Sequence, residues 1–186
     1  MATIFIFHGT AGYPEENWFP WLKSEMEQHG FDVVIPQFPT PENQTLEAWF
    51  DVFRKFESLV DDETTIVGHS LGGAFLLRLL EKIPVKIAVA CLVAAPVGIP
   101  GTKNWETDKA FVELPFDWKA IQQHAEKFLV FHSDDDPYVP LTNGEEAARQ
   151  LNVPLHFIPN AGHFNKAAGY IEFPQLRDAI LTTLKD

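Results

Sequence analysis

The chain has 186 residues, 46% of them hydrophobic and 13% aromatic, which predicts one folded domain, residues 1–186, with a sizeable core. Its 14 Lys and Arg against 26 Asp and Glu give a formal charge of −12, which argues against nucleic acid and anionic membrane surfaces as partners. A single cysteine, Cys91, excludes an internal disulfide framework and a cysteine-rich zinc site.

Six short apolar runs rich in β-branched and aromatic residues divide the chain. They are residues 3–7, 31–36, 64–68, 86–95, 127–132 and 154–159. Because these runs are apolar almost throughout, they predict strands that are covered on both faces. Helical periodicities separate most of them, at roughly 16–29, 46–59, 71–82, 143–151 and 174–185. The alternation predicts an α/β fold: a mainly parallel sheet of about six strands with helices on both faces.

The N-terminal run, MATIFIFHG, has no basic flank and is too short for a signal peptide. No apolar run approaches the roughly 20 residues of a membrane span. We therefore expect a cytoplasmic protein, a monomer or a homodimer, that binds neither membranes nor nucleic acid.

Residues 96–118 interrupt the alternation of strands and helices. This segment is rich in Pro, Gly and polar residues, yet it contains Trp105, Phe111, Phe116 and Trp118. Long irregular segments of compact domains are often lids or binding loops. The alternative is a surface excursion whose aromatic side chains pack back onto the core, and the sequence favours neither interpretation.

A Gly-x-Ser-x-Gly pattern, centred on Ser70, follows the third apolar run and precedes an apolar helical run. A serine at a sharp strand-to-helix turn has a strained backbone, and Gly68 and Gly72 remove side chains that would clash there. The turn would present the Ser70 hydroxyl at the carboxyl end of the sheet, beside a helix N-terminus that favours negative charge. The pattern alone arises by chance in roughly 5% of chains this long, but its placement favours a nucleophile over an idle serine.

A serine hydroxyl needs a histidine base that is itself oriented by a carboxylate. Of the seven histidines, His163 follows the last apolar run, in a turn marked by Asn160 and Gly162. From there its side chain could reach over the sheet edge toward Ser70. Its place in the chain also agrees with the order nucleophile, acid, base. We therefore interpret His163 as the base rather than as a plain loop histidine.

Two backbone N–H groups are candidates for an oxyanion hole. The first is that of Leu71, the residue after the nucleophile. The second is that of Thr10, in the His-Gly-Thr sequence directly after the first apolar run, where Gly9 allows a tight turn.

Three consecutive carboxylates, Asp134, Asp135 and Asp136, precede Pro137 at the end of the fifth apolar run. They are open to three interpretations: a solvated acidic turn, a cation site, or one catalytic carboxylate with two neighbours. A calcium loop alternates its ligands and has a glycine at its bend, so three adjacent aspartates argue against a cation site.

The motifs HGT, GHSLGG, SDDDPYVP and NAGHFN together resemble those of an α/β-hydrolase. The short length, LPFDW, DDPYVP and GHF are similar to the small serine hydrolases grouped with retinoblastoma-binding protein nine. The resemblance implies a compact α/β-hydrolase fold without a large cap domain. It also implies that Ser70 is the nucleophile, His163 the base and Asp136 the acid, with Asp135 as the alternative. Pro137 would hold Asp136 extended, which suits this role and leaves Asp134 and Asp135 solvated.

The resemblance further implies hydrolysis of a carboxylic ester, or a related acyl bond, of a small acyl substrate through an acyl-enzyme, with no metal or organic cofactor. We expect His69, Trp105, Phe116 and Trp118 to contact the substrate. A competing hypothesis is a protein-binding module built on the hydrolase fold, in which turnover is weak or absent.

Overall fold

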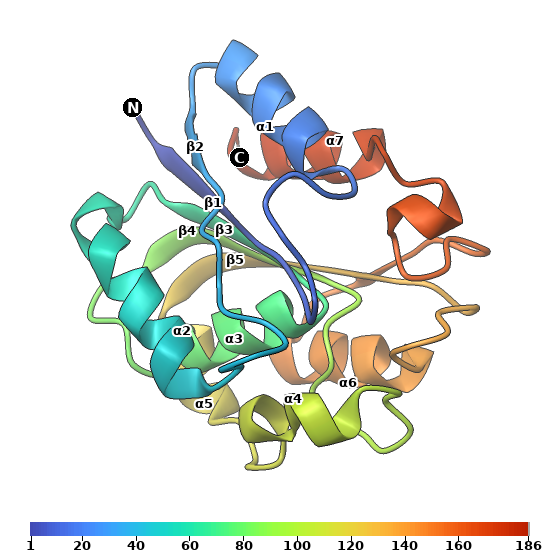
Figure 1. The fold of residues 1–186 in the computed structure, drawn as a ribbon. Coiled ribbons are helices and arrows are strands. Elements are labelled where there is room, and N and C mark those ends of the chain that lie inside the picture. The colour runs from blue at the N-terminus through green and yellow to red at the C-terminus, as the bar shows by residue number, and fades with distance from the viewer. Residues whose placement is uncertain (186) are drawn as a thin grey trace.

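A six-stranded sheet runs through the centre of the computed structural model, which describes residues 1–185 (Figure 1). Its strands are β1 (Thr3–Phe7), β2 (Asp32–Val34), β3 (Thr65–His69), β4 (Ile87–Val93), β5 (Ala125–His132) and β6 (Leu155–Phe157). The strand order is β2-β1-β3-β4-β5-β6, and each neighbouring pair is parallel. The predicted parallel sheet is confirmed.

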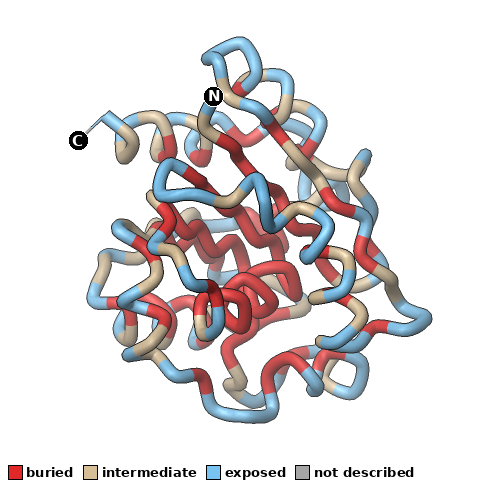
Figure 2. Tube along the Cα trace, turned by 90° about the vertical axis from the view of Figure 1, so that its left-hand side faces the viewer, coloured by how far each residue is buried: buried red, intermediate tan, exposed pale blue. Residues whose placement is uncertain are grey.

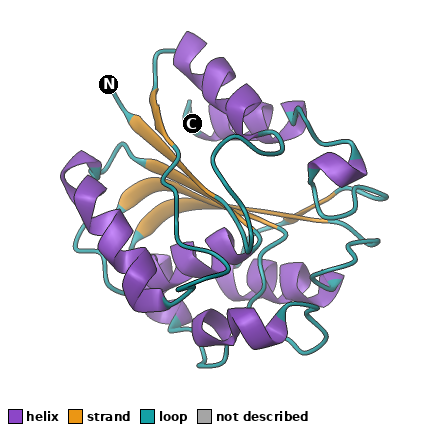
Figure 3. Cartoon of the chain, viewed as in Figure 1, coloured by secondary structure: helices purple, strands orange, loops and turns teal. Residues whose placement is uncertain are grey.

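Helices cover both faces of the sheet, as predicted (Figures 1 and 3). They are α1 (Phe19–Gln28), α2 (Leu46–Phe53), α3 (Leu71–Leu80), α4 (Trp105–Val112), α5 (Trp118–Gln123), α6 (Leu141–Leu151) and α7 (Pro174–Thr183). The helices α1 and α7 lie on one face, and α2 to α6 lie on the other. Two 3₁₀ turns, Arg54–Leu59 and Lys166–Ala168, complete the regular structure. None of the helices within residues 1–185 is long and apolar enough to cross a membrane.

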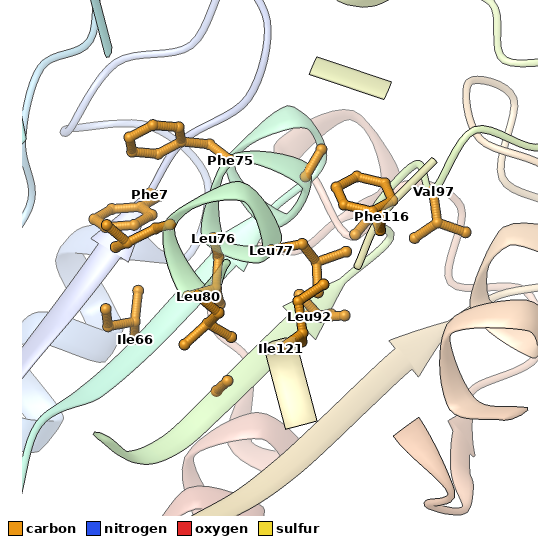
Figure 4. Packing of buried hydrophobic residues seen from close by; sticks show 14 of the residues in the cluster. Phe7, Ile66, Phe75, Leu76, Leu77, Leu80, Leu92, Val97, Phe116 and Ile121 are labelled. Atoms are coloured by element: carbon orange, nitrogen blue, oxygen red, sulfur yellow. The ribbon is translucent and has the colours of Figure 1, made fainter. Parts of the chain in front are cut away.

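Side chains of β1 alternate between two apolar layers. Phe5 and Phe7 pack on the α2 and α3 side, whereas Ile4 and Ile6 pack on the α1 and α7 side. Figure 2 shows the buried residues gathered in the middle of the molecule. All ten residues of α3 are buried, so this helix, which begins directly after Ser70, is fixed on every side (Figure 4).

Several predicted elements are shorter than expected. The edge strands β2 and β6 have three residues each, and prolines limit them: Pro36 follows β2, while Pro154 and Pro159 flank β6. The helix predicted over 46–59 is α-helical only to Phe53, after which the chain tightens into a 3₁₀ turn.

The segment 96–118 contains a helix, α4, and packs onto the core. Phe111 and Phe116 are buried in the cluster around α3, and Figure 4 shows Phe116 beside Leu77. Arg78 of α3 donates from Nε to the Phe111 carbonyl at 2.8 Å, and its guanidinium lies 3.9 Å from the centre of the Phe116 ring. These contacts favour the packed excursion over a lid. Within the described residues, the fold has no large cap domain.

Close backbone packing at Gly72 gives a stability prediction. A Cβ added there would overlap the carbonyl oxygens of Phe7 and His8. We expect Gly72→Ala to lower the free energy of unfolding by about 1–3 kcal/mol, measured by urea denaturation. Gly30→Ala is the control: Gly30 has φ 89° but no atom within 4 Å of an added Cβ, so only backbone strain of about 1 kcal/mol applies. Equal losses would mean that the contact at Gly72 is not the cause.

Candidate active site

Ser70 occupies a strained turn between β3 and α3. Its backbone has φ 54° and ψ −125°, a conformation that non-glycine residues seldom adopt. A Cβ on Gly68 would lie 2.5 Å from the Cα of Gly73, so the turn requires glycine there as predicted. The Ser70 N–H donates to the Val93 carbonyl at 2.9 Å, which joins the turn to β4. Ser70 is therefore held rigidly at the carboxyl end of the sheet.

His163 and Asp136 lie in contact, although 27 residues separate them. The His163 Nδ1 is 2.7 Å from the Asp136 Oδ2. Because an ionised carboxylate only accepts hydrogen bonds, Nδ1 must carry the proton and donate it. The neutral ring then has its lone pair on Nε2, the nitrogen that can accept a proton.

Backbone groups and His163 together keep Asp136 ionised. Its side chain is fully buried, and its Oδ1 accepts from the N–H groups of Tyr138 at 2.8 Å and Val139 at 3.0 Å. Burial raises the pKa of Asp136, but the hydrogen bond and charge of His163 and these two N–H groups outweigh it. The net result is a pKa below the ordinary value.

The two other aspartates hold the loop that carries His163. Asp134 Oδ1 accepts from the Asn160 N–H at 2.9 Å, and Asp135 Oδ1 accepts from the Gly162 N–H at 2.7 Å. Ser133 Oγ also donates to Asp135 Oδ1 at 2.7 Å. Both carboxylates are exposed to solvent, as expected, but each also accepts a backbone hydrogen bond. Asp136, rather than the alternative Asp135, contacts His163.

Asp135 gives a prediction about pH. The hydrogen bonds of Ser133 and Gly162 lower its pKa below 3.8. A carboxyl group whose pKa is lower in the folded state stabilises the fold above its unfolded pKa, and this contribution disappears as pH falls through the folded value. We therefore expect Asp135→Asn to be less stable than wild type at about pH 6, with the difference shrinking below about pH 4. Urea denaturation at both pH values measures it, and a pH-independent difference would contradict the assignment.

His69 supports the backbone of His163. Its Nε2 donates to the His163 carbonyl at 2.8 Å, and the two ring centres are 4.9 Å apart. Burial and the neighbouring His163 lower the pKa of His69 to about 3, so the ring is neutral. His69 lines the Ser70 cavity, as expected for a substrate contact, but its donor nitrogen is already used.

The loop after β1 lies against Ser70. A Cβ on Gly9 would be 2.8 Å from the Ser70 Cβ and 3.2 Å from its Oγ, so this approach requires glycine. The Gly9 carbonyl accepts from the Gly12 N–H at 3.0 Å and lies 2.9 Å from the His8 Nδ1. Since the Phe38 N–H donates to the His8 Nε2 at 2.9 Å, the neutral ring carries its proton on Nδ1 and donates it to Gly9.

This arrangement determines the direction of the Thr10 N–H. In a planar trans peptide the Gly9 carbonyl and the Thr10 N–H point in opposite directions. With the carbonyl held by His8 and Gly12, the N–H points away from these two donors. Within residues 1–185, neither this group nor the Leu71 N–H donates a hydrogen bond to the protein.

The three aromatic residues expected to contact the substrate lie elsewhere. Phe116 and Trp118 line a different cavity, and their ring centres are 5.5 Å apart. Trp105, the first residue of α4, is half-buried against the core cluster around α3. None of the three lines the Ser70 cavity, because the segment 96–118 packs against Arg78 and the core cluster around α3.

Polar residues make up most of the lining of the cavity at Ser70. The cavity has a volume of about 480 Å³, and its lining includes Ser70, His69, His163 and Gly9. Its other polar lining residues are Thr10, Glu16, Asn17, Asn104, Tyr138 and Asn165. Burial raises the pKa of Glu16 to about 7. Five of these residues were not predicted from the sequence: Glu16, Asn17, Asn104, Tyr138 and Asn165, which come from four separate loops. Within residues 1–185, no three His, Cys, Asp or Glu side chains are grouped to hold a metal ion.

Comparison with known proteins gives a family match over nearly the whole chain. A model of the family described as serine hydrolase matches residues 4–182. YdeN of Bacillus subtilis (strain 168) is 27% identical over 177 residues, which cover 95% of this chain and 93% of YdeN. Serine hydrolase RBBP9 of Rattus norvegicus is 28% identical over 164 residues, 88% of this chain and 86% of RBBP9.

Solved structures share the fold. The crystal structure of the B. subtilis ydeN gene product has a TM-score of 0.94 at 26% identity and covers 100% of both chains. Est1E of Butyrivibrio proteoclasticus, in a structure with ferulic acid bound, has a TM-score of 0.74 at 14% identity, covering 100% of this chain and 90% of Est1E. The second match shows the fold alone, which is the predicted α/β-hydrolase fold.

Proposed function

The chain belongs to the serine hydrolase family, and from this premise we propose that it hydrolyses a carboxylic ester of a small, polar substrate. Ser70 Oγ attacks the ester carbonyl while His163 Nε2 takes its proton, and Asp136 stabilises the resulting imidazolium. The alcohol then leaves with the proton from His163, and Ser70 holds the acyl group as an ester. Water, deprotonated by His163, attacks that ester, which releases the carboxylic acid and returns the proton to Ser70. These steps need no further reactant.

One observation carries the proposal: the His163 Nδ1 donates to the buried Asp136 at 2.7 Å, and His163 lines one cavity with Ser70. This contact leaves the Nε2 lone pair to accept the proton of the nucleophile. The N–H groups of Leu71 and Thr10 would stabilise the negative oxygen that develops during attack.

Fluorophosphonate labelling tests the proposal, since the probe reacts with activated serines and not with idle ones. We expect the wild type to be labelled at Ser70 and His163→Ala to be labelled far more slowly. A wild type that resists labelling while folded would favour the alternative, a binding module with little or no turnover.

The polar cavity predicts a preference for short acyl chains. A long chain gains affinity from apolar walls, whereas contact with Asn17, Asn104 or Glu16 would strip water from polar groups without replacing their hydrogen bonds. We expect kcat/KM to fall by about tenfold or more from p-nitrophenyl butyrate to p-nitrophenyl dodecanoate, compared below the micellar concentration. A value that rises with chain length would contradict this substrate class.

A further inference from the structure

Asp108, on α4, is a buried carboxylate that the proposed hydrolysis does not use. It is 2% exposed, and its Oδ1 accepts from Thr10 Oγ1 at 2.5 Å, from Gln44 Nε2 at 3.0 Å and from Thr107 Oγ1 at 3.1 Å. Burial raises the pKa of Asp108, although these three hydrogen bonds oppose the shift. Burying a carboxylate costs free energy unless hydrogen-bond donors surround it. The donors around Asp108 are therefore the groups that Asp108 holds in place.

Gln44 connects the loop after β1, which contains Thr10, to Asp108 by a second route. Its Oε1 accepts from Thr40 Oγ1 at 2.5 Å, and Thr40 Oγ1 accepts in turn from the Ala11 N–H at 2.7 Å. Thr10 is therefore held by its side chain, and the next residue by its backbone. One network joins the loop beside Ser70 to α4.

The helix that carries Asp108 is itself anchored to α3. Arg78 donates from Nη1 to the Pro115 carbonyl at 3.3 Å and from Nη2 to the Leu114 carbonyl, both just beyond α4. Arg78 is in addition paired at 2.9 Å with Glu81, the residue directly after α3. Because α3 begins directly after Ser70, Asp108 has a fixed position relative to the nucleophile.

We propose that Asp108 is a positioning residue that holds the Thr10 N–H at the oxyanion position beside Ser70. The role rests on the proposed function, because an oxyanion forms only if Ser70 attacks a carbonyl. His8 and Gly12 hold the Gly9 carbonyl on one side of the Thr10 N–H, and Asp108 holds the Thr10 side chain on the other. Oxyanion stabilisation depends on donors that are already in place, so a loosened loop lowers the rate of attack more than it weakens substrate binding.

The test uses Asp108→Leu, whose side chain has the same branched arrangement of heavy atoms, although it is larger, but accepts no hydrogen bond. We expect kcat for p-nitrophenyl acetate to fall about 10- to 100-fold with KM nearly unchanged. Asp108→Asn, which keeps an acceptor oxygen, should lose much less. Hydrogen exchange should accelerate in residues 8–12 and stay unchanged in β3 and α3. Glu106→Leu, an exposed carboxylate on the same helix, is the matched control and should match wild type.

Thr10→Val removes the same hydrogen bond from the other side and keeps the backbone N–H, so it replaces Asp108→Leu if that variant does not fold. The double variant should lose little more than Asp108→Leu alone, because the contact that Thr10→Val removes is already broken in Asp108→Leu. If wild type labels with fluorophosphonate but the single variants match it in kcat and exchange, the role of Asp108 is wrong and the proposed function stands. Faster exchange throughout β3 and α3 would indicate general destabilisation and would also overturn it. A wild type that neither labels nor hydrolyses would overturn both.

Discussion

Replacing Ser70 by alanine is expected to lower kcat for p-nitrophenyl acetate by on the order of 10⁴- to 10⁶-fold and to abolish fluorophosphonate labelling. The substitution removes the only atom that would form the acyl-enzyme. It leaves the turn intact, because glycine at 68 and 72 and the hydrogen bond from the residue 70 N–H to the Val93 carbonyl do not depend on the hydroxyl. Stability should therefore change little while activity disappears.

His163→Ala provides the second half of this experiment. Nucleophile and base act in one step, so each single variant should lose nearly as much activity as the double variant Ser70→Ala/His163→Ala. Ser24→Ala, on the surface helix α1, is the matched serine control and should match wild type. Equal labelling of Ser70→Ala and wild type would show that another residue reacts. Additive losses would show that Ser70 and His163 act independently.

Much of the fold could be predicted because its determinants are local. The central strands β1 and β4 are apolar at nearly every position, since helices cover both faces of the sheet. The turn at Ser70 could be predicted for a similar reason: Gly68 is required by contacts with Gly72 and Gly73, within the turn itself. Such constraints appear in a short stretch of sequence and need no knowledge of distant contacts.

The parts that could not be predicted depend on contacts between distant residues. Phe116 packs onto the core and not toward a substrate, because Arg78 lies over its ring. Arg78 is 38 positions earlier in the chain. The role of Asp108 depends on Thr10, 98 positions away, and α4 brings the two together. Neither Arg78 nor Asp108 belongs to a recognisable motif, so only the folded chain reveals these pairings.

The acidic stretch at 134–136 contains one role that could be predicted from the sequence and two that could not. Pro137 supported the interpretation of Asp136 as the residue that reaches His163, and the two are 2.7 Å apart. The backbone acceptor roles of Asp134 and Asp135 were missed, because a backbone N–H partner leaves no trace in the sequence. Three identical side chains thus have different partners, which predicts different consequences for the same substitution.

Asp136→Asn is expected to lower kcat by roughly 10⁴-fold with little loss of stability. Asp136 Oδ1 accepts from the Tyr138 and Val139 N–H groups, so the amide oxygen of an asparagine must take that place. Its NH₂ group then faces the His163 Nδ1 and donates to it, which moves the ring proton to Nε2. In that tautomer Nε2 cannot accept the Ser70 proton, and general base catalysis stops.

Nitrogen NMR of the histidine ring measures this tautomer directly, and kcat measures its consequence. Asp134→Asn is the matched control, because its amide oxygen can still accept from the Asn160 N–H and it does not touch His163. We expect this control to keep kcat within about threefold of wild type, since a surface substitution that preserves a hydrogen bond has small effects. Comparable losses in Asp134→Asn and Asp136→Asn would refute the assignment of Asp136. An Nδ1-protonated ring in an inactive Asp136→Asn would show that the loss has a cause other than the tautomer of His163.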